Sequence, residues 1–141
     1  MLNSSYVGRS LPATKPMTVT EESVAAFSRA FGFTDEATVP PTFLISLTLP
    51  ASNSLVDDPD FGLDFSRVLH REQRFSYHRP VAIGQVISCV VTVESIKVVA
   101  GNELLTMRTE VTEVGASESD AALATVWTTL FVASDAAMEG Q

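Results

Sequence analysis

The stretch from residue 37 to residue 56 contains no Asp, Glu, Lys or Arg, so most of it is expected to lie away from water. Twenty residues could span a membrane, but three prolines, one asparagine and six Ser or Thr residues make about half of them polar or helix-breaking. We therefore predict a buried helix with Pro41 in its first position, which ends or kinks at Pro50. Because Phe43 to Leu49 is uncharged all round, other elements must surround it.

A shorter helix is predicted before this stretch. Thr18 and Glu21 have the spacing of a capping box, and apolar residues recur on one helical face from Val24 to Phe31. Gly32 is a natural C-terminal stop for that helix.

Four strands are predicted after the helices, at about residues 68–77, 86–99, 104–114 and 121–133. The last is apolar on both faces, which places it inside its sheet. Helices followed by antiparallel strands indicate an α+β fold. A sheet that buries one face on the uncharged helix must curve around it, which is the hot-dog arrangement. An open edge of such a sheet is often paired across a dimer.

The length of 141 residues predicts one domain, with its core at about residues 18–133 and a frayed tail at residues 134–141. Charged residues make up 18% of the chain, below the usual ~25%, which suggests surface hidden in an oligomer. The single cysteine, Cys89, lies in an apolar run and is predicted to pack as a buried hydrophobe. It can form neither an internal disulfide nor a cysteine zinc cluster.

The net charge of −8 argues against two classes of partner. Nucleic-acid binding draws most of its affinity from a basic face, and anionic membranes also attract basic segments. The N-terminus lacks a basic segment followed by an apolar run, so no secretion signal is predicted and a cytoplasmic location is expected.

The segment Leu69-His70-Arg71-Glu72-Gln73-Arg74-Phe75-Ser76-Tyr77-His78-Arg79-Pro80 has strand length but an unusual composition. Polar and aromatic side chains on a rigid strand suit a ligand or partner surface, while a charged sheet edge that discourages aggregation is the alternative. We expect His70 and Glu72 to be mostly buried and directly hydrogen-bonded, since an unpaired buried polar group costs ~1–3 kcal/mol.

The same two residues share parity along the strand and lie on one face unless a bulge intervenes. A His–carboxylate pair can perform acid–base chemistry, but a structural network with the neighbouring arginines is the preferred interpretation. His70 and His78 lie ~26 Å apart in an extended strand, so they cannot share a metal ion. We find no phosphate-binding glycine loop and no nucleophile motif, and predict no cofactor.

Three segments resemble MaoC-like dehydratases. Pro40-Pro41-Thr42-Phe43 resembles the P-P-T-F opening of their central helix, and residues 69–80 resemble their L-H-G-E-Q-x-F-x-Y-H-R-P strand, with Arg71 in place of glycine. Gly84-Gln85-Val86 resembles their G-D-x turn, with Gln85 in place of aspartate. The resemblance covers about residues 18–133. It is closest to the N-terminal dehydratase-like branch, which includes non-catalytic subunits of (3R)-hydroxyacyl-ACP dehydratase.

The resemblance implies a role in fatty acid metabolism, with an acyl thioester of CoA or acyl carrier protein as the ligand. Catalytic members carry an aspartate and a histidine in a segment like G-D-x-N-P-x-H, whereas Phe33 to Val39 offers only Asp35 and no histidine. No catalytic residue is therefore assigned to this chain. The substrate-binding residues it implies are Pro41, Thr42, Phe43, His70, Gln73 and Phe75. The residues it implies for an interface or structural network are Glu72, Arg74 and His78.

The favoured interpretation is an acyl-thioester-binding subunit of a 3-hydroxyacyl-thioester dehydratase or enoyl hydratase, in a homodimer or in a heterodimer with a catalytic MaoC-like chain. One alternative is a self-sufficient hydro-lyase or thioesterase that uses His70 or Glu72. Another is a homodimeric acyl-thioester-binding protein without chemistry. If the chain has activity of its own, the resemblance predicts that of a hydro-lyase.

Overall fold

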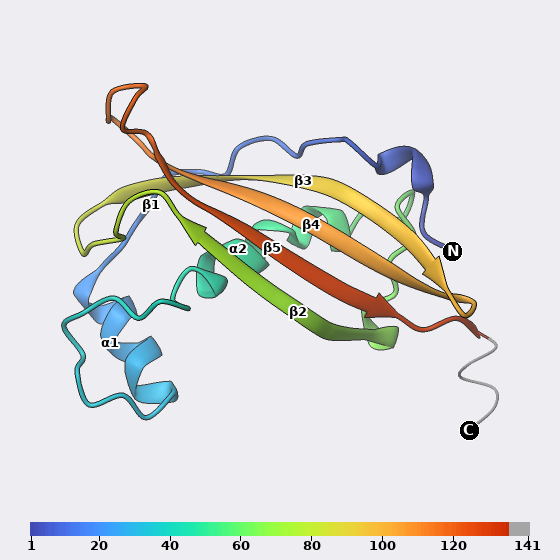
Figure 1. Cartoon of the computed structure of the whole chain (residues 1–141), viewed down its shortest axis with the longest axis horizontal. Helices are drawn as coiled ribbons and strands as arrows, with labels where there is room; N and C mark the ends of the chain where they lie inside the picture. Colours follow the sequence, from blue (N-terminus) through green and yellow to red (C-terminus); the bar gives the residue numbers. More distant parts are fainter. Residues whose placement is uncertain (136–141) are drawn as a thin grey trace.

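A computed structural model describes residues 1–135 and contains one five-stranded antiparallel sheet with the order β1-β3-β4-β5-β2 (Figure 1). The strands are β1 (Met17–Thr18), β2 (Val68–Tyr77), β3 (Val86–Val99), β4 (Asn102–Glu113) and β5 (Ala122–Val132). The helices are α1 (Glu21–Ala30), α2 (Ile45–Ala51) and α3 (Asn53–Val56), with short 3-10 turns at Ser4–Tyr6 and Phe65–Arg67. The four predicted strands and the α+β hot-dog class are confirmed.

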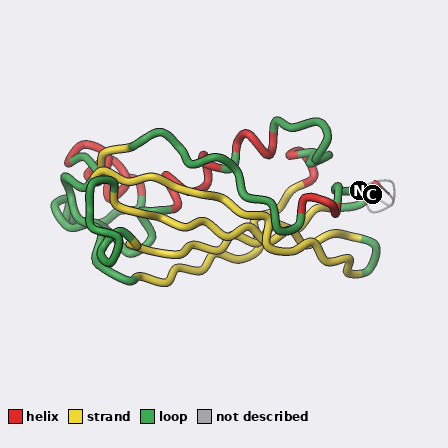
Figure 2. Tube along the Cα trace, turned by 90° about the horizontal axis from the view of Figure 1, so that it is seen from above, coloured by secondary structure: helices red, strands yellow, loops and turns green. Residues whose placement is uncertain are grey.

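The helices α2 and α3 run along one face of the curved sheet, which we call the inner face (Figure 2). Side chains on this face alternate with those on the outer face along each strand. The inner-face residues of β5 include Val126, Thr128 and Leu130, all of which are buried. The buried side chains of Phe43 and Leu44 pack into the core just before α2. Cys89 is fully buried on β3, as predicted.

The two edges of the sheet differ. The edge of β3 is covered by β1 and by the N-terminal segment, where the amides of Gly8 and Leu11 donate to the carbonyls of Val93 and Val91 at 2.8 and 2.7 Å. The other edge is β2, which among the described residues pairs only with β5. The strand with the unusual polar composition is therefore the open edge, and β5 lies inside the sheet, as predicted.

The first helix begins two residues later than the sequence pattern predicts. Thr20, rather than Thr18, is its N-cap, and the Thr20 hydroxyl accepts a hydrogen bond from the backbone N–H of Ser23 at 3.1 Å. The predicted capping box of Thr18 and Glu21 is wrong because Thr18 belongs to β1, where it pairs with Val86. A residue in an extended edge strand cannot also start a helix one residue later.

The second helix is also shorter than predicted. Residues 41–44 form tight turns, in which the amide of Phe43 donates to the carbonyl of Pro40 at 3.0 Å, and the regular helix α2 starts only at Ile45. Pro50 lies inside α2, which ends one residue later and agrees with the predicted stop. Leu49 is 36% exposed, so the expectation that this helix is surrounded all round is wrong for the single chain.

The C-terminal part of the described chain is anchored to the sheet. The amide of Ser134 donates to Asn102 Oδ1 at 3.0 Å, and Asp135 forms an ion pair with Arg67. The rest of the predicted frayed tail, residues 136–141, lies outside the described residues. No helix within residues 1–135 is long and apolar enough to cross a membrane.

Candidate functional site

Strand β2 presents a defined set of side chains to the inner face. In the antiparallel register, His70 lies opposite Leu130 and Gln73 lies opposite Thr128. Directly opposed residues in an antiparallel pair project from the same face, and both partners on β5 are buried against the helices. The inner face of β2 therefore carries His70 and Gln73, followed by Phe75, which lies opposite the buried Val126.

A β-bulge separates His70 from Glu72. The register shifts between these two residues, and Glu72 lies opposite Thr129 on the outer face, while Arg71 has no partner in the β2–β5 ladder. The extra residue of a bulge reverses the alternation of the strand beyond it. The interpretation of His70 and Glu72 as an acid–base pair is therefore wrong, because the sheet lies between their side chains.

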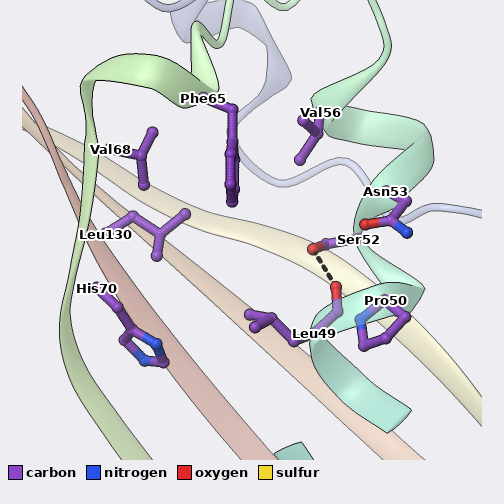
Figure 3. A pocket seen from close by; sticks show the side chains of 9 residues that line it. All are labelled: Leu49, Pro50, Ser52, Asn53, Val56, Phe65, Val68, His70 and Leu130. Carbon is purple, nitrogen blue, oxygen red and sulfur yellow. Dashed lines mark hydrogen bonds between the residues drawn. The ribbon is translucent and has the colours of Figure 1, made fainter. Parts of the chain in front are cut away.

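A cavity of about 340 Å³ opens between the helical segment and the edge of the sheet (Figure 3). His70 and Leu130 line one wall, from β2 and β5, and Leu49 faces them from α2. The other lining residues are Pro50, Ser52, Asn53, Val56, Phe65 and Val68. The hydroxyl of Ser52 is already used, since it donates to the Leu49 carbonyl at 2.7 Å. An apolar cavity with one imidazole suits an aliphatic group carrying a polar end.

The remaining predicted substrate-binding residues do not line this cavity. Pro41 instead borders two depressions of about 420 and 270 Å³. Thr42 is exposed, and Phe43 is only 1% exposed because it packs in the core. Gln73 and Phe75 are half-buried on the inner face of β2. The structure therefore brings only His70 of this set into the cavity.

Asp35, the only candidate for the family's catalytic aspartate, caps its own turn. Its carboxylate accepts hydrogen bonds from the amides of Ala37 and Thr38 at 2.9 and 3.2 Å. A hydrogen bond from the Thr38 side chain, followed by these two amide bonds, holds the pKa of the Asp35 carboxyl below its usual range. Asp35 borders the 420 Å³ depression, and neither His70 nor His78 lines it. Within the described chain, no histidine is thus placed to work with this aspartate.

Arg74 lies within a group of polar and aromatic side chains on the outer face of the sheet. The Arg74 guanidinium lies 4.1 Å from the centre of the Trp127 ring, and the Trp127 indole N–H donates to Glu94 at 3.3 Å. Arg108 joins this network through ion pairs to Glu94 and Glu110 at 3.3 and 3.1 Å. These contacts tie the polar side chains of β2, β3, β4 and β5 together across the sheet.

His78 reaches the same face, whereas Glu72 does not join the network. The His78 ring lies 3.4 Å from the Thr125 hydroxyl, which donates to Glu110 at 2.9 Å. Glu72 is exposed, and its side chain forms no hydrogen bond or ion pair with any described residue. The expectation that His70 and Glu72 are both mostly buried and hydrogen-bonded is wrong for the single chain. His70 is exposed as well, but it faces the cavity.

Several residues of the site were not singled out from the sequence. Leu49 and Pro50 both line the 340 Å³ cavity and come from the uncharged stretch. A proline in an apolar run was the sequence signal for the end of this helix, and that end lies beside the cavity. Tyr77 donates from its hydroxyl to the Pro41 carbonyl, and burial raises the pKa of this phenol. No three His, Cys, Asp or Glu side chains between residues 1 and 135 are grouped so that they could hold a metal ion.

Comparisons with known proteins identify the family. Residues 5–126 match the family model described as FAS1-like, dehydratase domain region. A UPF0336 protein of Streptomyces coelicolor is 39% identical over an alignment of 144 positions, and the alignment covers 92% of this chain and 93% of that protein.

Solved structures share the fold at lower identity. The C-terminally truncated HadBC (3R-hydroxyacyl-ACP dehydratase) complex from Mycobacterium tuberculosis has a TM-score of 0.74 at 19% identity, over 89% of this chain and 96% of that chain. A MaoC-like dehydratase has a TM-score of 0.76 at 20% identity, over 94% of this chain and 44% of that chain. With its hot-dog fold and these matches, the chain belongs to the family of FAS1-like dehydratase domain regions.

Proposed function

We propose that this chain is the acyl-thioester-binding subunit of a 3-hydroxyacyl-thioester dehydratase or enoyl hydratase. In this proposal a partner chain of the same fold supplies the aspartate and histidine that move the protons. The carrier of the acyl group is CoA or acyl carrier protein, and the complex acts in the cytoplasm. The observation that carries the proposal is the apolar cavity lined by His70 in a member of a dehydratase family.

The shape and chemistry of the cavity support acyl binding. Its volume of about 340 Å³ falls within the range of small-molecule sites, and most of its lining is aliphatic or aromatic. His70 adds one polar group that can hydrogen-bond a carbonyl or hydroxyl oxygen. Leu49 lines the cavity and is 36% exposed, so the cavity reaches the surface beside α2.

The arrangement of ionisable groups supports a partner-dependent role. Asp35 has no histidine beside it among the described residues, and the bulge separates His70 from Glu72. General acid–base groups contribute typically ~10²–10⁴-fold each to a rate, so a site that lacks one is nearly silent. The matched HadBC structure is named as a (3R)-hydroxyacyl-ACP dehydratase complex, and an assembly of this kind is proposed here.

A hydration assay with crotonyl-CoA and longer enoyl-CoAs tests the catalytic part of this proposal. We expect negligible turnover by the purified chain alone, and turnover when a MaoC-like chain with an intact D-x-N-P-x-H segment is added. Robust turnover by the isolated chain that disappears in His70→Ala would contradict the proposal and favour a self-sufficient hydro-lyase.

Calorimetric titration with acyl-CoA tests the binding part. Leu49→Trp fills the cavity from α2, and we expect it to weaken acyl-CoA binding at least ~10-fold, which corresponds to ~1.4 kcal/mol. Leu69→Trp is the matched control, because Leu69 is also an exposed leucine but lies opposite Phe131 on the outer face. Equal affinity of both variants and the unmodified chain would show that the ligand binds elsewhere.

A further inference from the structure

The inner face of the sheet carries several polar residues within the core, and two of them, Gln73 and Thr128, form a pair. On β5, Thr128 is 4% exposed and lies between Val126 and Leu130, which belong to two different apolar clusters. On β2, Gln73 lies opposite Thr128 in the register. A core that served only packing would carry apolar residues at both positions. The pair therefore calls for a further explanation.

The carboxamide of Gln73 is held in one orientation but is only half used. The Thr128 hydroxyl donates to Gln73 Oε1 at 2.9 Å, which fixes the rotation of the amide group. The amide nitrogen, Nε2, is buried and donates to no acceptor among the described residues. A buried donor without an acceptor is destabilising, so its presence suggests a ligand that supplies the acceptor.

In the described part of the chain, two buried hydroxyl groups also lack hydrogen-bond partners, but their position on helices explains them. These are the hydroxyls of Ser28 on α1 and Thr48 on α2. A helical hydroxyl can rotate toward the carbonyl one turn earlier. The Gln73 nitrogen has no such local acceptor, because the amide is held by its contact with the neighbouring strand.

The unpaired donor is next to the cavity. After His70, Gln73 is the next residue of β2 on the inner face, and Thr128 has the same relation to Leu130 on β5. His70 and Leu130 both line the cavity wall (Figure 3). The Gln73–Thr128 pair is thus one row of side chains beyond this wall, toward Phe75 and the apolar cluster that contains Val126.

We propose that Gln73 is a ligand-positioning residue, whose amide N–H donates a hydrogen bond to the carbonyl oxygen of the bound acyl thioester. This inference rests on the proposed function. It assigns to Gln73 the hydrogen bond that determines how far the ligand extends into the cavity. A hydrocarbon chain offers no acceptor, whereas a thioester carbonyl offers one at a fixed position along the molecule. Thr128 orients the donor, and the hydrogen bond sets how far the acyl chain extends into the cavity lined by His70.

The test compares two ligands that differ only at the carbonyl. Hexanoyl-CoA has the thioester carbonyl, whereas the S-hexyl-CoA thioether has a methylene in its place. Calorimetric titration is performed on the chain alone and on its complex with a catalytic partner. We expect the unmodified protein to prefer hexanoyl-CoA by about 10-fold, as for one hydrogen bond of ~1.4 kcal/mol.

Variants at the pair identify the donor. Gln73→Met keeps the length of the side chain without its polar atoms, and we expect the preference to fall below ~2-fold while the affinity for the thioether stays unchanged. The double variant Gln73→Met/Thr128→Val leaves no unpaired hydroxyl. It replaces Gln73→Met in the titration if the single variant folds poorly. Thr128→Val alone is expected to reduce the preference without abolishing thioether binding.

The outcomes separate this inference from the proposed function. Equal binding of both ligands by the unmodified protein, or an unchanged preference in Gln73→Met, would overturn the role of Gln73 and leave acyl binding intact. Binding of neither ligand by the chain or its complex would overturn both.

Discussion

His70 and Glu72 lie on opposite faces of the sheet, although a single residue separates them in the chain. His70 is opposite Leu130 on the inner face, and Glu72 is opposite Thr129 on the outer face. Regular alternation would bring both side chains to the inner face, where an unpaired carboxylate is costly. The bulge at Arg71 therefore decides which polar side chains of this strand face the cavity.

Two single-residue deletions test the bulge. Removal of Arg71 leaves a regular strand in which His70, Gln73 and Phe75 keep their inner positions, so we expect a folded protein with a modest loss of stability. Removal of Arg74 takes away the same charge from the regular part of the strand. It forces either Phe75 outward or Glu72 inward, and both outcomes are strongly destabilising.

Urea denaturation of the two deletion variants provides the measurement. We expect cooperative unfolding for the protein without Arg71, and a loss of at least ~3 kcal/mol or failure to fold for the protein without Arg74. Similar stability of the two variants would contradict the described position of the bulge.

Glu72→Ala is expected to have little effect on the folding of the chain. Glu72 is exposed and unpaired with any described residue, so its removal should change the free energy of unfolding by no more than ~0.5 kcal/mol. Phe75→Ala, on the inner face of the same strand, is the comparison and should cost at least ~2 kcal/mol. If Glu72→Ala abolished folding or assembly, the residue would belong to an interface with another chain.

A pair of threonine substitutions tests the start of α1. Thr20→Ala removes the hydroxyl that accepts the Ser23 amide, and we expect a loss of about 1 kcal/mol in the free energy of unfolding. Thr18→Ala is the control, because Thr18 is exposed in β1 and caps no helix. Chemical denaturation of both variants decides between the two candidate caps. A larger loss in the free energy of unfolding for Thr18→Ala than for Thr20→Ala would identify Thr18 as the N-cap.

Cys89 is expected to be protected from thiol reagents in the folded protein. Burial raises the pKa of its thiol from 9.0 to about 11, which lowers the thiolate fraction at pH 8 by roughly 100-fold. We expect slow labelling by iodoacetamide at pH 8 and rapid labelling in guanidinium. Equal labelling rates in the two conditions would show that this part of the sheet opens readily.

The same pKa shift predicts a dependence of stability on alkaline pH. Because the folded state holds the thiol proton more tightly, this contribution is complete below about pH 9 and is lost as the pH rises through about 11. Cys89→Ala is expected to remove this component, and the measurement is the free energy of unfolding between pH 8 and pH 11 in both proteins. An identical decline in the two proteins would assign it to other groups.

The open edge of β2 predicts self-association or a partner. A ten-residue edge strand with unpaired backbone groups favours pairing with a second chain. We expect size-exclusion chromatography with light scattering to give at least twice the chain mass of 15.1 kDa. A monodisperse species near 15 kDa at micromolar concentration would contradict this prediction.

Local pattern was sufficient to predict the strands. The alternating run at 86–99 and the run at 121–133, which is apolar on both faces, located two strands to within a residue or two, because such patterns are properties of the segments themselves. The same reasoning located the buried Cys89 and the helix end near Pro50. The polar composition of residues 69–80, together with the resemblance to MaoC-like dehydratases, directed attention to His70 and Gln73.

The tertiary structure decided what local pattern leaves open. Thr20 became the helix cap because β1 holds Thr18 in an edge strand, a pairing that depends on the distant β3. Arg71 became the bulge because the register of β2 is set by β5, where the inner-face residues must stay buried. The cavity likewise joins Leu49 to His70 from segments more than twenty residues apart. Such relationships depend on contacts between distant segments, and no local pattern contains them.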